Sequence, residues 1–248
     1  MCDPTAEAGD QALCRSVMYA TLAAAFRPPT VEGGERLEGS RPLLLDAARA
    51  IDGRAGRPGL TLLVQELVAS LSGWKDLVVA HQRLFGHTAH GAVPPYETEY
   101  GHAEAFQQSQ DLADIAGFYR AFGLTLEPAR RERIDHVSVE CEFLSFLCCK
   151  EARELQSGDA ACCTEVRKAQ KLFLRDHLGR FGRSFARALA KAASHPFHRH
   201  AGQLCFEFLT AECAFLDVPP GPEFIALAAQ RELEVPMACS SCTLEDHE

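Results

Sequence analysis

The chain has 248 residues, of which 47% are hydrophobic and 24% charged, as in an ordinary folded protein and unlike a disordered one. Its formal net charge of −9 disfavours nucleic acid and anionic lipid as partners and favours a positively charged peptide. The opening MCDPTAEAGDQ lacks the basic and apolar regions of a signal peptide, and no uncharged apolar run reaches the ~18 residues that span a bilayer. We therefore expect a cytoplasmic protein without membrane insertion, in which the 11 cysteines stay reduced.

Helical periodicity runs through the first half of the chain. Residues 1–11 are expected to form a flexible N-terminus, and apolar residues then recur at helical spacing through Asp10–Phe26. The sequence RPPT ends this helix, because proline lacks a backbone donor and clashes with the preceding turn. We expect the Gly- and Arg-rich residues 27–42 to form a loop. Three further helices are predicted over residues 43–51, 60–71 and 74–86.

The second half of the chain is also helical in pattern. Ser109 is expected to cap a helix that stops at Gly123, and Asp135 to cap the longest candidate, residues 134–158. Residues 161–194 predict two helices broken near Gly179–Gly182. The last strong helix covers residues 196–216 with Pro196 in its first turn, and a short terminal helix is predicted over residues 223–233.

Strand signals are almost absent, because alternation is short and no Asn-Gly hairpin occurs. The sequence therefore predicts an all-α fold of about nine to ten helices. We expect the helical domain to span residues 12–214, with a larger N-terminal part to about residue 130 and a smaller C-terminal part after it. Residues 215–248 are expected to hold a linker, the short helix and a Cys-containing tail.

Recognised catalytic motifs are missing from the chain. It has no phosphate-binding loop, no dinucleotide fingerprint, no zinc-protease motif and no serine-hydrolase elbow. We therefore expect a binding protein without a cofactor rather than an enzyme.

The segment HTAHGAVPPYETEYG interrupts the helices and offers the first candidate site. Leu84 and Phe85 precede it, Pro95 keeps the backbone extended, Tyr96 offers an aromatic face, and Glu97 adds charge. Such a surface could hold an extended peptide with arginine and apolar residues. The alternative is a rigid connection in which Leu84, Phe85 and Tyr96 are core anchors.

The segment RERIDHVSVECE offers the second candidate site. In the functional interpretation Asp135 binds arginine, His136 donates or accepts a hydrogen bond, and Glu140 adds charge at a groove mouth. In the alternative interpretation Asp135 is only a helix cap and His136 an incidental surface residue.

The tail offers a third and weaker candidate. Cys239 and Cys242 have C-x-x-C spacing and His247 follows, but a zinc site needs four ligands and only three are local. A metal- or cluster-binding redox protein is therefore kept as the alternative function, against a tail with incidental thiols.

Four segments in order resemble the TorD/DmsD/NarJ family of cytoplasmic maturation chaperones for molybdoenzymes. They are RSVMYATLAAAFRPP, HQRLFG with VPPYETEYG, RERIDHVSVECEFLSFL, and the stretch from FLRDHL to FLTAE. Together they run from about residue 12 to residue 214. PYETEYG and the C-x-x-C tail look closest to chaperones of type II dimethyl sulfoxide reductase-like enzymes.

The resemblance implies a TorD-like helical bundle, monomeric or dimeric by helix swapping. Its partner would be the catalytic subunit of a molybdoenzyme, often bound through its twin-arginine signal peptide, until molybdenum cofactor is inserted and export proceeds. The family's functional positions correspond here to Leu84, Phe85, Pro95, Tyr96, Asp135 and His136, to which we add Glu97 and Glu140 for their charge.

The sequence departs from the family pattern at several positions, among them Phe181 or Gly182 near the usual tryptophan. His81 replaces an aromatic, Ile134 replaces the proline before Asp135, and His198 stands where tyrosine often occurs. These departures change which side chains are expected to line the groove. They therefore affect the expected identity of the partner more than the expected class of function.

Overall fold

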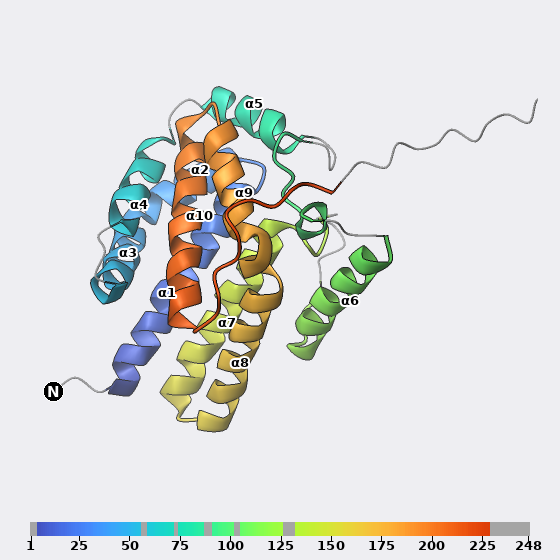
Figure 1. The fold of residues 1–248 in the computed structure, drawn as a ribbon. Coiled ribbons are helices and arrows are strands. Elements are labelled where there is room, and N and C mark those ends of the chain that lie inside the picture. Colours follow the sequence, from blue (N-terminus) through green and yellow to red (C-terminus); the bar gives the residue numbers. More distant parts are fainter. Residues whose placement is uncertain are drawn as a thin grey trace, which may run out of the picture.

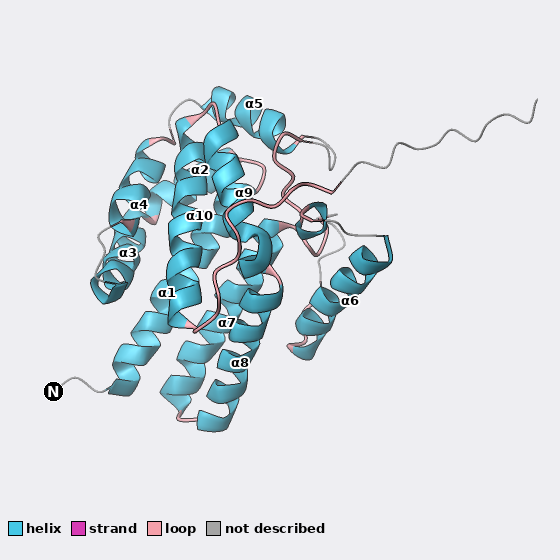
Figure 2. Ribbon diagram, in the orientation of Figure 1, coloured by secondary structure: helices cyan, strands magenta, loops and turns pink. Residues whose placement is uncertain are grey.

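The structure is a computed structural model that describes residues 4–55, 59–71, 74–86, 91–101, 105–125 and 132–228. These residues form ten α-helices and one short 3₁₀ helix, and no strand beyond two isolated bridges (Figure 2). The predicted all-α fold is confirmed. The helices are α1 (Pro4–Phe26), α2 (Val31–Gly39), α3 (Arg41–Ala55), α4 (Leu60–Ala69), α5 (Trp74–Phe85), η1 (Glu97–Glu99), α6 (Ala105–Ala121), α7 (Val137–Ser157), α8 (Ala160–Asp176), α9 (Leu178–Ala192) and α10 (Pro196–Phe215).

The centre of the bundle is the pair α1 and α7, which pack along each other (Figure 1). α9 and α10 pack as a second pair, α3 and α4 flank α1 and α10, and α8 returns along α7. One continuous apolar core joins them, and its largest buried side chains include Phe173, Phe181, Phe185 and Phe208. Burying side chains of this size contributes roughly 1.5–3 kcal/mol each.

A buried ionic cluster ties four helices together. Arg15 of α1 is 1% exposed and donates from Nε and Nη2 to the carboxylate of Glu212 in α10, both at 2.8 Å. It also donates to Glu151 of α7 at 3.2 Å and to the side-chain oxygen of Gln170 of α8 at 2.7 Å. Removing one partner of such a cluster leaves an uncompensated buried charge, which costs about 3–5 kcal/mol.

α6 stands beside the bundle (Figure 1), and apolar side chains of this helix pack against the core. Ile115 and Tyr119 are 0% and 6% exposed, and Tyr119 lies against Phe143 of α7 with ring centroids 4.8 Å apart. The hydroxyl of Tyr119 donates to the carbonyl of Ile134 at 3.1 Å. α6 therefore packs against the segment that leads into α7.

Several predicted boundaries near the N-terminal half were wrong. α1 is helical from Pro4, whereas the sequence pattern began it at Asp10. Residues 31–39, expected to be loop, form α2, because the Thr30 side chain accepts a hydrogen bond from the Gly33 amide at 3.1 Å and caps the helix. α6 starts at Ala105, so Ser109 lies inside the helix and does not cap it.

Two predictions in the C-terminal half were also wrong. The break between α8 and α9 falls at His177, and Gly179 and Gly182 lie inside α9. A Cβ on Gly182 would lie 2.6 Å from a methyl carbon of Leu209, so this glycine permits close helix packing. Residues 223–228, the described part of the predicted terminal helix, are extended, because they pair with the loop after η1.

No helix in the described ranges has the length and apolar character needed to cross a membrane. The proposed division near residue 130 stays a prediction.

Candidate functional site

The loop 91–101 is held against the segment that enters α7. The Glu97 amide donates to the Asp135 carbonyl at 2.9 Å, and the Val137 amide donates to the Pro95 carbonyl at 2.8 Å. These bonds form an isolated antiparallel bridge between Tyr96 and His136. Pro95 has no N–H to donate, but its carbonyl serves as an acceptor. The two segments singled out in the sequence therefore form one site.

The end of α5 anchors this loop. Leu84 and Phe85 are 3% and 5% exposed and belong to the core, and the Val93 amide donates to the Leu84 carbonyl at 2.9 Å. A Cβ on Gly91 would lie 2.3 Å from the Phe85 carbonyl carbon, so only glycine fits there. Leu84 and Phe85 thus position the loop, and a peptide contact by either stays a prediction.

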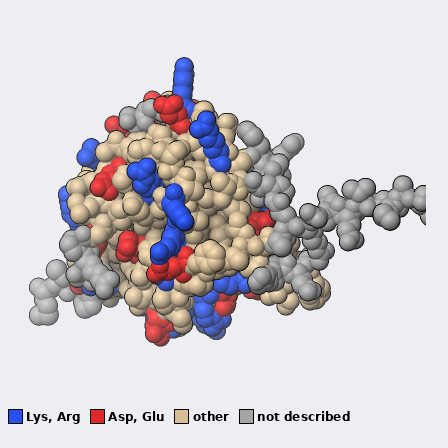
Figure 3. All heavy atoms as spheres, turned by 45° about the horizontal axis from the view of Figure 1, so that its top comes forward, with Lys and Arg blue, Asp and Glu red and all other residues tan. Residues whose placement is uncertain are grey.

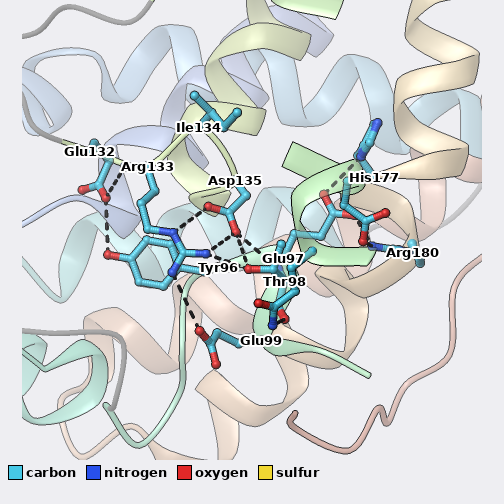
Figure 4. A network of polar contacts seen from close by, with 12 residues as sticks. Tyr96, Glu97, Thr98, Glu99, Glu132, Arg133, Ile134, Asp135, His177 and Arg180 are labelled. Carbon is cyan, nitrogen blue, oxygen red and sulfur yellow. Dashed lines mark hydrogen bonds and ion pairs between the residues drawn. The ribbon is translucent and has the colours of Figure 1, made fainter. Parts of the chain in front are cut away.

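An arginine cradle lies at the surface of the site (Figure 4). Arg133 donates from Nε to Asp135 Oδ1 at 3.0 Å and from Nη2 to Asp135 Oδ2 at 2.8 Å. Nη2 also donates to the Thr98 hydroxyl at 2.7 Å, and the guanidinium carbon lies 4.3 Å from the centre of the Tyr96 ring. Paired hydrogen bonds and an aromatic face are the contacts that distinguish arginine from lysine. We define the arginine cradle as Tyr96, Thr98 and Asp135.

Asp135 is fully buried and its carboxylate has donors on two sides. Besides Arg133, the Thr98 hydroxyl donates to Oδ2 at 2.8 Å and the Thr98 amide at 3.3 Å. The sequence predicted Asp135 as the cap of α7, but Asp135 does not cap this helix. His136 is the cap, because its Nδ1 accepts from the Ser138 amide at 3.1 Å.

Two further carboxylates line the rim of the arginine cradle. Glu99 lies 3.7 Å from Arg133, and the side chains of Glu99 and Arg133 are 24% and 39% exposed. Glu132 accepts from the Tyr96 hydroxyl at 3.4 Å and from the Arg133 amide at 3.0 Å. Burial, and then the charge of Glu132, raise the pKa of Tyr96. Asp135 and Glu99 therefore face the guanidinium of Arg133, and Glu132 adds a third negative charge beside the Tyr96 hydroxyl.

The charged side chains on the face of the molecule drawn in Figure 3 are mixed in sign. In this view, turned by 45° from that of Figure 1, basic and acidic side chains lie interspersed among the described residues. The field of such a mixed face is weak beyond about 10 Å at physiological salt, so charges there attract a basic partner only at short range.

Behind the arginine cradle lies a buried acidic pair. Glu97 is 0% exposed, accepts from Arg180, and lies 3.2 Å from His177 Nδ1. Glu140 is also 0% exposed, and neither of its oxygens accepts a hydrogen bond from a donor among the described residues. Burial, together with the negative charges of Glu97 and Asp135, raises the pKa of Glu140 well above its usual range, which favours the neutral acid.

His136 is neutral at the mouth of α7. It is 4% exposed, and burial lowers its pKa from 6.5 to about 3. Its ring meets the Tyr96 ring edge to face, with centroids 5.3 Å apart. It therefore supports the position of Tyr96 and supplies no positive charge near neutral pH.

The C-terminal segment borders the site from the other side (Figure 1). The Gly101 amide donates to the Ala226 carbonyl at 2.8 Å, and the Ala228 amide donates to the Glu99 carbonyl at 2.7 Å. The Ile225 amide donates to the Ser184 hydroxyl of α9 at 2.8 Å. The chain thus adds an extended segment to the edge of the loop, which explains why it is not helical here.

An apolar cleft of about 490 Å³ lies between α1 and the region of α2 and α3. Leu43, which is 58% exposed, and Leu44 line it from α3, and Arg27 lies on its wall. Arg27 pairs with Glu142 of α7 at 2.5 Å, and its charge contributes to lowering the pKa of His136. The cleft therefore opens near the first turns of α7.

The structure brings the eight predicted site residues to one end of α7. Seven of them are buried, and Tyr96 alone among the eight is half-buried. Sequence reasoning missed Thr98, Arg133, His177 and Arg180, although Thr98 and Arg133 stand inside the quoted segments. Cys239, Cys242 and His247 lie outside the described residues. Within those residues, the one group with metal-ligand spacing is Glu154, Asp159 and Cys162.

Comparison with known proteins places these observations in a family context. A family model described as nitrate reductase delta subunit matches residues 55–187, more than half of the chain and all eight predicted site residues. The chain is also 28% identical over 173 residues to a perchlorate reductase assembly chaperone protein of Dechloromonas aromatica (strain RCB), a match that covers 68% of this chain and 75% of that protein.

Proposed function

Because the chain belongs to the nitrate reductase delta subunit family, we propose that it is an assembly chaperone that binds the catalytic subunit of a molybdoenzyme. Membership confirms the resemblance that four sequence segments had indicated. The relative from Dechloromonas aromatica is named for the assembly of perchlorate reductase, and we carry over only the class of client.

The feature that carries the detailed proposal is the arginine cradle. It holds a guanidinium by paired hydrogen bonds to Asp135 and stacks it on Tyr96 at 4.3 Å. An arginine of a client segment can make the same contacts at the position that Arg133 occupies. We propose that the twin-arginine signal peptide of the client docks here, in the cytoplasm, before cofactor insertion and export.

The apolar cleft suits the rest of such a peptide. A signal peptide carries an apolar run after its arginines. Apolar side chains of α1, α2 and α3 line much of the cleft together with Arg27 and Arg36, and Arg27 pairs with Glu142 near the start of α7. We propose that the apolar run occupies this cleft while an arginine occupies the arginine cradle.

Calorimetric titration tests the proposal. The full chain is titrated with a peptide that has two adjacent arginines and an apolar run, at two salt concentrations, and with the Arg→Gln peptide. We expect micromolar binding that weakens with salt and is lost with the Gln peptide. Equal binding of both peptides, or no binding at all, would refute the peptide model.

Asp135→Asn provides the matched variant. It keeps the shape and the Thr98 contacts but removes the charge that grips a guanidinium, so peptide binding should weaken by about 1–3 kcal/mol. Asp46→Asn, an exposed acid of α3 with a 73% exposed side chain, is the control and should bind as the parent chain does. Recovery of a molybdoenzyme subunit with the parent chain, but not with Asp135→Asn, would support the same site.

A further inference from the structure

The arginine cradle is already filled, and its occupant is part of the same chain. Arg133 satisfies both oxygens of Asp135, reaches the Thr98 hydroxyl and covers the Tyr96 ring. No position remains on the Asp135 carboxylate for a second paired guanidinium, because its other donors come from Thr98. An arginine from a client can reach these groups only if Arg133 leaves.

We propose that Arg133 is an intramolecular stand-in for the client's arginine, which holds the arginine cradle in the free protein and exchanges with the incoming side chain. This inference rests on the proposed function, and it adds a competition that sets affinity and selectivity.

Exchange is physically favoured over an empty cradle. Asp135 is 0% exposed, and losing Arg133 without replacement leaves a buried charge with only the Thr98 donors. A second guanidinium restores the same bonds. Lysine cannot, because an ammonium is a point charge without the planar fork. The self-filled site therefore rejects weak cations and accepts an arginine.

The position of Arg133 also allows its side chain to leave the arginine cradle. Its side chain is 39% exposed, and Glu99 on the rim lies 3.7 Å away as an alternative partner outside the cradle. Residue 134 is isoleucine, so Arg133 is free of the backbone restriction that a following proline imposes. The guanidinium can swing toward the rim without a change in the buried frame of Asp135 and Thr98.

The competition predicts a gain of affinity when Arg133 is removed. The apparent dissociation constant of a client equals its intrinsic value divided by the fraction of protein with an open site. Arg133→Ala should therefore bind the twin-arginine peptide about tenfold more tightly than the parent chain. Arg175→Ala is the control, since Arg175 is an exposed arginine paired with Asp176 and its loss removes the same charge without opening the cradle. The control should show no gain.

A small probe separates this inference from the proposed function. Millimolar methylguanidinium should raise the melting temperature of Arg133→Ala but not that of the parent chain, and methylammonium should raise neither. If no peptide binds any variant, the peptide model fails, and the methylguanidinium result still decides whether Arg133 fills a guanidinium site.

Two outcomes would overturn the stand-in. One is wild-type or weaker peptide affinity in an Arg133→Ala chain that keeps its helical circular dichroism. The other is equal methylguanidinium protection of both chains. Where Arg133→Ala does not fold, Arg133→Gln, which keeps a hydrogen-bond donor over Tyr96, takes its place in both measurements with the same expected results.

Discussion

Tyr96 and His136, forty positions apart in the sequence, form an isolated backbone bridge and stack edge to face with ring centroids 5.3 Å apart. This pairing brings the aromatic face of the loop beside the mouth of α7. It also gives Tyr96 a fixed orientation, with one face toward Arg133 and the hydroxyl toward Glu132.

Tyr96 substitutions should separate stacking from hydrogen bonding. Tyr96→Phe keeps the ring under the guanidinium and loses only the long hydroxyl contact to Glu132, so peptide affinity should stay near that of the parent chain. In an Arg133→Ala chain, where the arginine cradle is open, Tyr96→Ala removes the stack on the peptide's arginine, which is worth about 0.5–2 kcal/mol. Titration calorimetry of both variants with the twin-arginine peptide gives the comparison. Equal losses in the two variants would argue that the ring face does not contact the ligand.

Glu140 should make the protein less stable as the pH rises. Its carboxyl titrates near 4.5 in the unfolded chain, while burial and nearby acids raise its pKa in the folded chain. Above pH 4.5 the folded state therefore binds more protons, and the free energy of unfolding falls by up to about 1.4 kcal/mol per pH unit. Glu140→Gln should remove this slope and stabilise the protein between pH 5 and pH 8.

Urea unfolding at several pH values measures that effect. Glu142→Gln, two positions along the same helix and 44% exposed in its side chain, is the control. A difference between Glu140→Gln and the parent chain that does not change with pH would contradict the assignment of a buried neutral acid.

His198 should make the protein less stable as the pH falls. Burial lowers the pKa of His198 from 6.5 to about 3 and that of its neighbour His81 to about 4. The unfolded state therefore takes up more protons below pH 6.5, and stability is lost as the pH falls from 6.5 toward 4 and then 3. His198 has no hydrogen-bond partner for either nitrogen among the described residues.

His198→Phe keeps a ring of similar shape and removes the proton uptake. Between pH 6.5 and pH 5 the variant should lose about 2 kcal/mol less stability than the parent chain. Thermal or urea unfolding across this range is the measurement. Parallel pH curves for the two chains would show that His198 is not a buried neutral histidine.

Substitution of Leu43 tests whether the apolar run of the peptide occupies the apolar cleft. It is 58% exposed and lines the cleft, so Leu43→Glu should leave stability within about 0.5 kcal/mol of the parent value. Binding of a peptide with an apolar run should weaken, while a peptide with the arginines alone should bind as before. Leu62→Glu, on α4 and 59% exposed but away from the cleft, is the matched control. Equal effects of both substitutions would place the apolar run elsewhere.

Much of the fold could be predicted from periodicity, because long helices repeat their apolar face several times. α7 and α10 have this property, and Pro196 in the first turn of α10 was correctly placed. α2 was missed because Gly33 and Gly34 weaken its helical pattern, and the Thr30 cap was not weighed against them. Residues 223–228 have a helical pattern, but pairing with the loop overrides the local preference.

The structure brings the predicted site residues together, but their roles in binding stay predictions, and the sequence did not indicate how the site is built. The sequence indicated that Tyr96 and Asp135 belong together, and the structure places them side by side. It could not indicate that Asp135 is buried, since burial depends on Thr98 and Arg133 closing over the carboxylate. The sequence pattern indicates only that Arg133 is a surface arginine. Its spacing gives no sign that its guanidinium stacks on the Tyr96 ring.

The backbone pairing of Ala226 and Ala228 with the loop sets an order of events during synthesis. The loop is translated more than a hundred residues before these partners exist, so its outer edge stays unpaired until residue 228 has been made. A growing chain therefore presents an incomplete edge to other polypeptides.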